Sequence, residues 1–137
     1  MKKTVPRFPL LLLTALLTLS ALAACKTTSV VIAPDLSPAD LFQKAQEATD
    51  AGKYELALRY YKTFQERYPD ELERNLWARY EIALLRHKQG DDQAAVQLLD
   101  DLLALYSGEE AKDLPPGPRI LAEKIKAKIT SVEPAKP

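Results

Sequence analysis

The chain has 137 residues, with 19 basic and 19 acidic side chains and therefore no formal net charge at neutral pH. Its length is that of one ordinary domain, and its one cysteine excludes a disulfide within the chain. Residues 1–24 hold three of the basic residues and no acidic one, so residues 25–137 carry 16 basic and 19 acidic side chains, a net charge of about −3. An acidic surface argues against nucleic-acid binding.

Residues 1–24 differ sharply in composition from the rest of the chain. Lys2, Lys3 and Arg7 make a basic start, and residues 8–22 form an uncharged apolar run. This run is shorter than the roughly 20 residues that cross a bilayer core. The pattern predicts a signal peptide over residues 1–24 and no lasting membrane span.

The apolar run ends in Leu22-Ala23-Ala24-Cys25, which resembles the lipobox of bacterial lipoproteins. The resemblance implies that Cys25 is the first residue of the mature chain and receives a diacylglycerol on its thiol. The alternative, a buried or disulfide-bonded cysteine, has no second cysteine in the chain to support it. Several acyl chains would anchor the protein to a membrane. We expect no cofactor beyond this covalent lipid. Lys26 stands where an aspartate signals inner-membrane retention in enterobacterial lipoproteins, which favours the outer membrane, facing the periplasm.

Residues 25–36 show no helical periodicity, and this pattern predicts a lipidated tether. The short apolar patch Val30-Val31-Ile32 within it either docks against the domain or lies loosely. Ser37-Pro38-Ala39-Asp40 then predicts a helix start, because Ser37 can accept a bond from a backbone amide and proline suits the first helical position. We expect a helical domain over residues 37–131.

Two helical hairpins are predicted from apolar residues at spacings of three and four. The first turns at Gly52 and ends at Pro69, and the second begins with the capping-box-like pattern Asp70-Glu71-Leu72-Glu73 and turns at Gly90. The apolar positions of the four helices are, in chain order, Leu41, Phe42, Ala45 and Ala48; Tyr54, Ala57, Leu58, Tyr61, Phe64 and Tyr68; Leu72, Leu76, Tyr80, Ala83 and Leu84; and Ala95, Leu98, Leu99, Leu102, Leu103 and Tyr106.

A connection rich in glycine and proline follows over residues 107–118. Ile120, Leu121, Ile125 and Ile129 then predict one more amphipathic helix at 119–130. Residues 132–137 are typical of a disordered tail.

The two hairpins align at a spacing of 38 residues when Gly52 is placed on Gly90. Small residues at Ala45 and Ala57, where paired helices cross, and the aromatic Tyr61 resemble the pattern of tetratricopeptide repeats, whose typical length is 34 residues. The family pattern departs at several positions, among them Leu41 in place of tryptophan. The resemblance covers residues 38–106 and implies an all-α fold: a short superhelix of two hairpins with the last helix as a C-terminal cap.

A lipobox followed by a tetratricopeptide-like segment is similar to envelope lipoproteins such as the start of the tetratricopeptide subunit of the outer-membrane β-barrel assembly machinery. That subunit carries about five repeats, so this chain would be a shortened relative. Participation in outer-membrane protein assembly is a hypothesis from this resemblance.

In tetratricopeptide arrays the first helix of each repeat lines the inner face. Carrying this pattern across by position predicts a partner-binding face, which we call the A face, made of Phe42, Gln46 and Thr49 from the first repeat and Trp77, Tyr80, Leu84 and His87 from the second. Such aromatic surfaces can receive an apolar or extended peptide. The equally weighted alternative is that these residues pack against the last helix or the tether.

Catalysis and metal binding are not expected. His87 is the only histidine, so a metal site around it would need carboxylates alone. Asp91-Asp92 and Asp100-Asp101 fall at a helix start and on a helix surface, where solvated carboxylates are ordinary. No phosphate-binding glycine loop, metalloprotease motif or nucleophile elbow occurs.

The expected function is therefore that of a membrane-anchored interaction scaffold in the cell envelope, with an envelope protein or peptide as partner. A structural alternative is self-association into a homo-oligomer through the same face. A peptidoglycan-linked enzyme accessory is the third and least supported reading.

Overall fold

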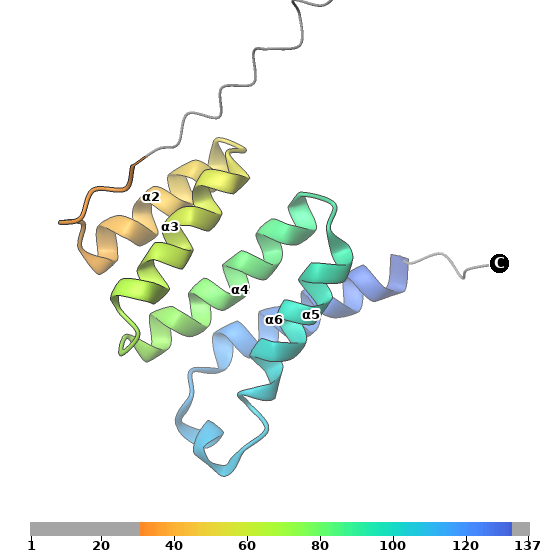
Figure 1. Ribbon diagram of the computed structural model, residues 1–137. Helices are drawn as coiled ribbons and strands as arrows, with labels where there is room; N and C mark the ends of the chain where they lie inside the picture. The colour runs from red at the N-terminus through yellow and green to blue at the C-terminus, as the bar shows by residue number, and fades with distance from the viewer. Residues whose placement is uncertain (1–30, 133–137) are drawn as a thin grey trace, which may run out of the picture. The chain divides into compact units, whose positions relative to one another are not determined.

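The computed structural model describes residues 31–132, and in this range five α-helices follow one another, the first four joined by short turns and the last two by a longer connection (Figure 1). The helices are α2 (Pro38–Asp50), α3 (Tyr54–Arg67), α4 (Leu72–Lys88), α5 (Asp92–Ala104) and α6 (Pro116–Val132), and a 3-10 turn η2 (Glu109–Asp113) precedes α6. The predicted signal peptide, Cys25, residues 26–30 of the tether and residues 133–137 of the tail lie outside the described residues.

The helices pack as two hairpins and one further helix, which confirms the predicted fold class. α2 pairs with α3 and α4 pairs with α5, while α3 against α4 joins the two hairpins (Figure 1). α6 packs on both α5 and α4. The C-terminal helix thus covers the second hairpin, as the repeat pattern predicts.

Both hairpins turn at a glycine in the left-handed region. Gly52 has φ +68° and Gly90 has φ +83°, a conformation that glycine adopts without steric cost. In each turn the residue after the glycine donates its backbone amide back to the ending helix, Lys53 to the carbonyl of Ala48 and Asp91 to that of Arg86. The two turns are the same motif, which confirms the alignment of Gly52 with Gly90.

The predicted start of the first helix is confirmed in detail. The backbone amide of Asp40 donates to the Ser37 hydroxyl at 3.2 Å, and the Ser37 amide donates to the Asp40 carboxylate at 3.1 Å. These reciprocal bonds form a capping box, with Pro38 at the first helical position. The Ser37 hydroxyl, which donates to the Asp40 carboxylate at 2.6 Å, and the Ser37 backbone amide together hold the pKa of Asp40 below its ordinary value.

The capping box predicted at residues 70–73 is wrong. α4 begins at Leu72, and its N-cap residue Glu71 makes no side-chain capping bond. Instead the Asn75 side-chain amide donates to the carbonyls of Tyr68, Pro69 and Glu71. The side chain that serves this helix start is thus a donor to backbone carbonyls, whereas a capping box needs a side-chain acceptor for backbone amides.

The core consists of two apolar clusters. The first lies between α2, α3 and α4 and the second between α4, α5 and α6. Buried members of the first are Leu41, Ala45, Ala48, Ala57, Leu58, Tyr61, Phe64, Ala78, Ile82 and Leu85; those of the second are Leu76, Tyr80, Ala83, Ala95, Leu99, Leu102, Ala122 and Ile129. Because α4 contributes to both clusters, it is the central helix of the fold.

The last helix begins at Pro116, three residues before the predicted start. Pro116 and Pro118 both lie in its first turn, where backbone amides have no partner within the helix and proline costs no hydrogen bond. Prolines that suggested a loop in the sequence therefore belong to the helix.

Candidate binding surface

The A-face residues of α2 differ in exposure. Phe42 is half-buried and stacks edge-to-face on Tyr61, with centroids 5.3 Å apart, and on Phe64 at 4.6 Å. Gln46 is exposed and donates its side-chain amide to the Tyr61 hydroxyl at 3.0 Å. Thr49 is half-buried, and its hydroxyl donates to a carbonyl of its own helix. Of these three, only Gln46 is exposed, so it is the side chain that a partner can reach.

The aromatic A-face residues of α4 pack against α6. Tyr80 is 9% exposed and belongs to the cluster that includes Ala122 and Ile129 of α6. The Trp77 ring lies so close to Gly117 that a Cβ added there would stand 2.8 Å from Cζ2 of the ring. Trp77 and Tyr80 contact each other edge-to-face at 6.1 Å. In this part of the A face the last helix covers the aromatic side chains.

Leu84 and His87 lie farther along α4 and are half-buried. The Nδ1 atom of His87 is 2.5 Å from a carboxylate oxygen of Asp92, across the turn between α4 and α5. Within residues 31–132 no group of three or more histidine, cysteine, aspartate or glutamate side chains is arranged to hold a metal ion. His87 therefore contributes to the hairpin turn.

The two aspartate pairs noted in the sequence have structural partners. The Asp91 carboxylate accepts the amide of Ala94 and caps α5. Asp100 forms an ion pair with Lys126 of α6. Asp91 thus stabilises the start of α5, and Asp100 links α5 to α6.

Glu81 is a half-buried carboxylate on α4 that the sequence analysis missed. Burial raises its pKa above the ordinary value, while nearby Lys88 and a hydrogen bond from Gln46 act in the opposite direction. Burial, followed by the charge of Glu81, also raises the pKa of Tyr61 and of Tyr80. The A face thus carries a polar centre in which one carboxylate lacks full hydration.

A signal for Glu81 was present in the sequence. Trp77, Glu81, Leu84 and Lys88 follow one another at spacings of four, three and four, so Glu81 lies on the same stripe of α4 as the predicted face. A charged residue on a half-buried stripe is unusual enough to mark a site.

Part of the predicted tether packs on the first hairpin. Ile32 and Leu36 contact the first cluster, and Val31 before them is 86% exposed. The Tyr68 hydroxyl donates to the carbonyl of Leu36 at 2.8 Å, and the Arg67 guanidinium donates to that of Ala33 at 2.8 Å. The compact unit accordingly begins at Ile32, earlier than the predicted start at residue 37.

A groove of about 540 Å³ lies on another side of the molecule, over α4 and between α3 and α5. Leu72, which the periodicity placed on the apolar stripe of α4, lines this groove and is 59% exposed. Its expected place on the buried stripe is wrong because Leu72 is the first residue of α4, where no neighbouring helix covers it. Leu105, just after α5, is 44% exposed and also lines the groove.

Comparison with known proteins identifies the repeats. A tetratricopeptide-repeat family model matches residues 39–71 and 77–108, and its two starts are 38 residues apart, the spacing expected from the turn glycines. The chain is a tetratricopeptide-repeat protein. Such repeats imply a protein–protein interaction scaffold and are typically not catalytic.

A protein of Treponema pallidum (strain Nichols), described as uncharacterized, is 35% identical to this tetratricopeptide-repeat protein over 104 residues. The match covers 74% of this chain and 42% of the relative, so the chain spans less than half of the relative's length. No solved structure matches the chain. Among the described helices none is long and apolar enough to cross a membrane.

Proposed function

We propose that this chain is a lipid-anchored lipoprotein of the cell envelope whose two repeats dock a protein or peptide partner. The observation that carries the binding role is the pair of tetratricopeptide repeats at residues 39–71 and 77–108. The support for anchoring is Leu22-Ala23-Ala24-Cys25, which follows a basic start and an apolar run in the order of a lipoprotein signal.

The proposed contact surface is the open part of the A face. Gln46 is exposed there, and Glu81 and Leu84 are half-buried beside the covered aromatic residues. An extended segment bound at this surface would meet one hydrogen-bonding amide, one carboxylate and one apolar side chain. This mixture suits a polar peptide with a basic residue opposite Glu81, since an incompletely hydrated carboxylate gains most from a paired cation.

Anchoring is tested by the intact mass of the protein purified from a bacterial envelope. We expect a mature chain that begins at Cys25 and carries diacylglycerol. The variant Cys25→Ser should lose the lipid mass and leave the membrane fraction. A full-length chain without lipid would contradict the anchoring proposal.

Docking is tested with a photoreactive amino acid at Gln46 in cells, followed by mass spectrometry of the crosslinked product. The matched control places the same amino acid at Gln97, which is exposed on α5. Capture of an envelope protein from Gln46 and not from Gln97 supports the proposal. Capture of a β-barrel assembly component would assign the protein to outer-membrane protein assembly, and capture of a second copy would favour the homo-oligomer.

A further inference from the structure

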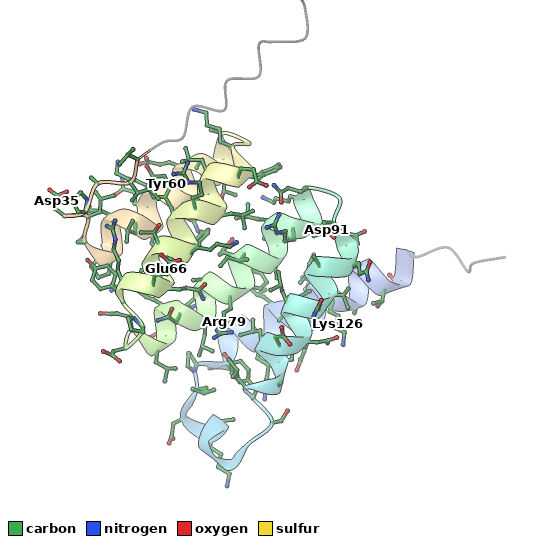
Figure 2. All side chains as sticks on the ribbon, in the orientation of Figure 1. Asp35, Tyr60, Glu66, Arg79, Asp91 and Lys126 are labelled. Atoms are coloured by element: carbon green, nitrogen blue, oxygen red, sulfur yellow. The ribbon has the colours of Figure 1, made fainter. Side chains whose placement is uncertain are left out.

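The groove between α3 and α5 is a second surface with the features of a binding site. Figure 2 labels Arg79, which lies on α4 and lines this groove. Its volume of about 540 Å³ falls within the range of about 300–1,000 Å³ that is typical of ligand pockets. No A-face residue lines it, so it is separate from the proposed docking surface.

The floor of the groove is apolar. Leu76 and Ile82 are almost fully buried beneath it and Leu98 is half-buried, whereas Leu72 and Leu105 keep 59% and 44% of their surface exposed. These two are among the four most exposed large hydrophobic residues in the described chain. Large apolar side chains gathered in a concave site are a mark of a surface that a partner covers.

The charges around this floor are predominantly basic and lack partners. Lys62 of α3 and Arg79 of α4 line the groove, and neither makes a hydrogen bond or ion pair with any residue from 31 to 132. Asp101 is the single acidic residue of the lining. By contrast, Arg86 and Lys126 elsewhere on the domain have ion-pair partners. The groove therefore has a local surplus of positive charge in a domain that is acidic as a whole.

We propose that this groove binds an acidic amphipathic peptide segment of a partner protein. The partner's aliphatic side chains cover Leu72 and Leu105, and its carboxylates pair with Lys62 and Arg79. The distance along α4 from Leu72 to Ile82 is about 15 Å, which matches about three turns of a bound helix. A second copy of this chain is a weaker occupant, because a stable dimer buries about 800 Å² per partner and two exposed leucines supply only a fraction of that area.

The test is selection of a random 12-residue peptide library on the immobilised full chain in detergent, followed by fluorescence anisotropy of the enriched peptides. The groove variants are Leu72→Ser with Leu105→Ser, and Lys62→Glu with Arg79→Glu. Their matched controls are Ile120→Ser, whose side chain is 53% exposed on α6, and Lys124→Glu, also exposed on α6. Circular dichroism checks that every variant keeps its helices.

We expect enriched peptides that combine aliphatic residues with an excess of Asp and Glu. The charge reversal should weaken their binding about tenfold or more and should make binding less sensitive to salt, and the double serine variant should weaken it comparably. The two controls should bind as the parent protein does.

Enrichment of basic or uncharged peptides, equal enrichment on the groove variants, or no enrichment at all would overturn the proposal. Sedimentation of the chain alone tests whether a second copy occupies the groove. A dimer that is lost in the Leu72→Ser variant would show that the groove is a self-association site, and this result would also overturn the peptide proposal. Peptides whose binding depends on Gln46 and not on Lys62 would refute this inference while leaving the proposed A-face function intact.

Discussion

The two hairpins follow one backbone plan but are filled with different side chains. In the first, Phe42 packs edge-to-face between Tyr61 and Phe64. In the second, the positions facing the partner helix are aliphatic, with Leu99 and Leu102 fully buried on α5. The repeat thus specifies helix length, turn and small residues at the crossings, while the remaining space is filled by whichever apolar side chains fit.

The outer sides of the two hairpins are also closed differently. The first is covered by residues 32–36, which are held by side-chain donors from Arg67 and Tyr68 to backbone carbonyls. The second is covered by α6, which buries Ala122 and Ile129 and adds an ion pair to α5. Repeat arrays need both ends covered, and here the C-terminal cover is a packed helix whereas the N-terminal cover is a short strap.

Removing the central aromatic ring of the first hairpin should have the largest effect. Phe64→Ala deletes a fully buried ring that contacts Phe42, and we expect a loss of about 3–5 kcal/mol in the free energy of unfolding. The matched change in the second hairpin, Leu99→Ala, should cost about 2–5 kcal/mol. Urea unfolding followed by circular dichroism measures both. A loss below about 1 kcal/mol for Phe64→Ala would contradict an aromatic core in the first hairpin.

Disturbing the contact between α6 and α4 should cause the second largest loss in the free energy of unfolding. A methyl group at Gly117 would stand 2.8 Å from Cζ2 of the Trp77 ring, so Gly117→Ala should cost about 1–3 kcal/mol. Trp77 is the only tryptophan, and its fluorescence should report the change directly. In a Trp77→Leu background the same glycine change should cost much less, because the ring that it strikes is gone. Equal costs in both backgrounds would show that Trp77 does not pack on Gly117.

Loosening the N-terminal strap should have a smaller effect. Tyr68→Phe removes the hydroxyl that donates to the Leu36 carbonyl, with an expected loss of about 0.5–1.5 kcal/mol. Tyr60 is the control, since its hydroxyl makes no hydrogen bond within residues 31–132, and Tyr60→Phe should be close to neutral. Hydrogen exchange at residues 32–36 should rise in Tyr68→Phe alone. Unchanged exchange would show that the strap is held by its apolar contacts.

The smallest effect should depend on pH. Because burial raises the pKa of Glu81 in the folded chain above its ordinary value of 4.5, the folded state holds this proton more tightly than the unfolded state. The contribution of Glu81 to the free energy of unfolding is therefore fully present below pH 4.5, and it is lost as the pH rises through the raised pKa of the folded state. Glu81→Gln should raise the melting temperature at pH 7 slightly and flatten this part of the pH profile.

Glu66→Gln, at an exposed position of α3, is the control for Glu81→Gln (Figure 2). It should change neither the melting temperature nor the pH profile. A lower melting temperature for Glu81→Gln at pH 7 would mean that the charged carboxylate has a stabilising partner.

Local signals in the sequence predicted much of the fold. Gly52 and Gly90 marked both turns, Ser37 marked the first cap, and the repeat spacing of 38 agrees with the matched family model. They were less reliable where helix ends depend on neighbours. The capping box at residues 70–73 did not form, and the Asn75 side chain donates to backbone carbonyls of that turn instead. The helix α6 began before its expected boundary, because Pro116 and Pro118 lie in its first turn.

The sequence by itself determined the helices, the turns and the repeat, because each depends on backbone preferences and apolar spacing within a few residues. Only the tertiary structure decided which side chains of α4 are covered. Trp77 lies against Gly117, 40 residues away in the chain, while Leu72 on the same helix is left exposed beside the groove. The burial of each α4 side chain depends on which helix, distant in the sequence, packs against that position, and the sequence of α4 alone does not determine this.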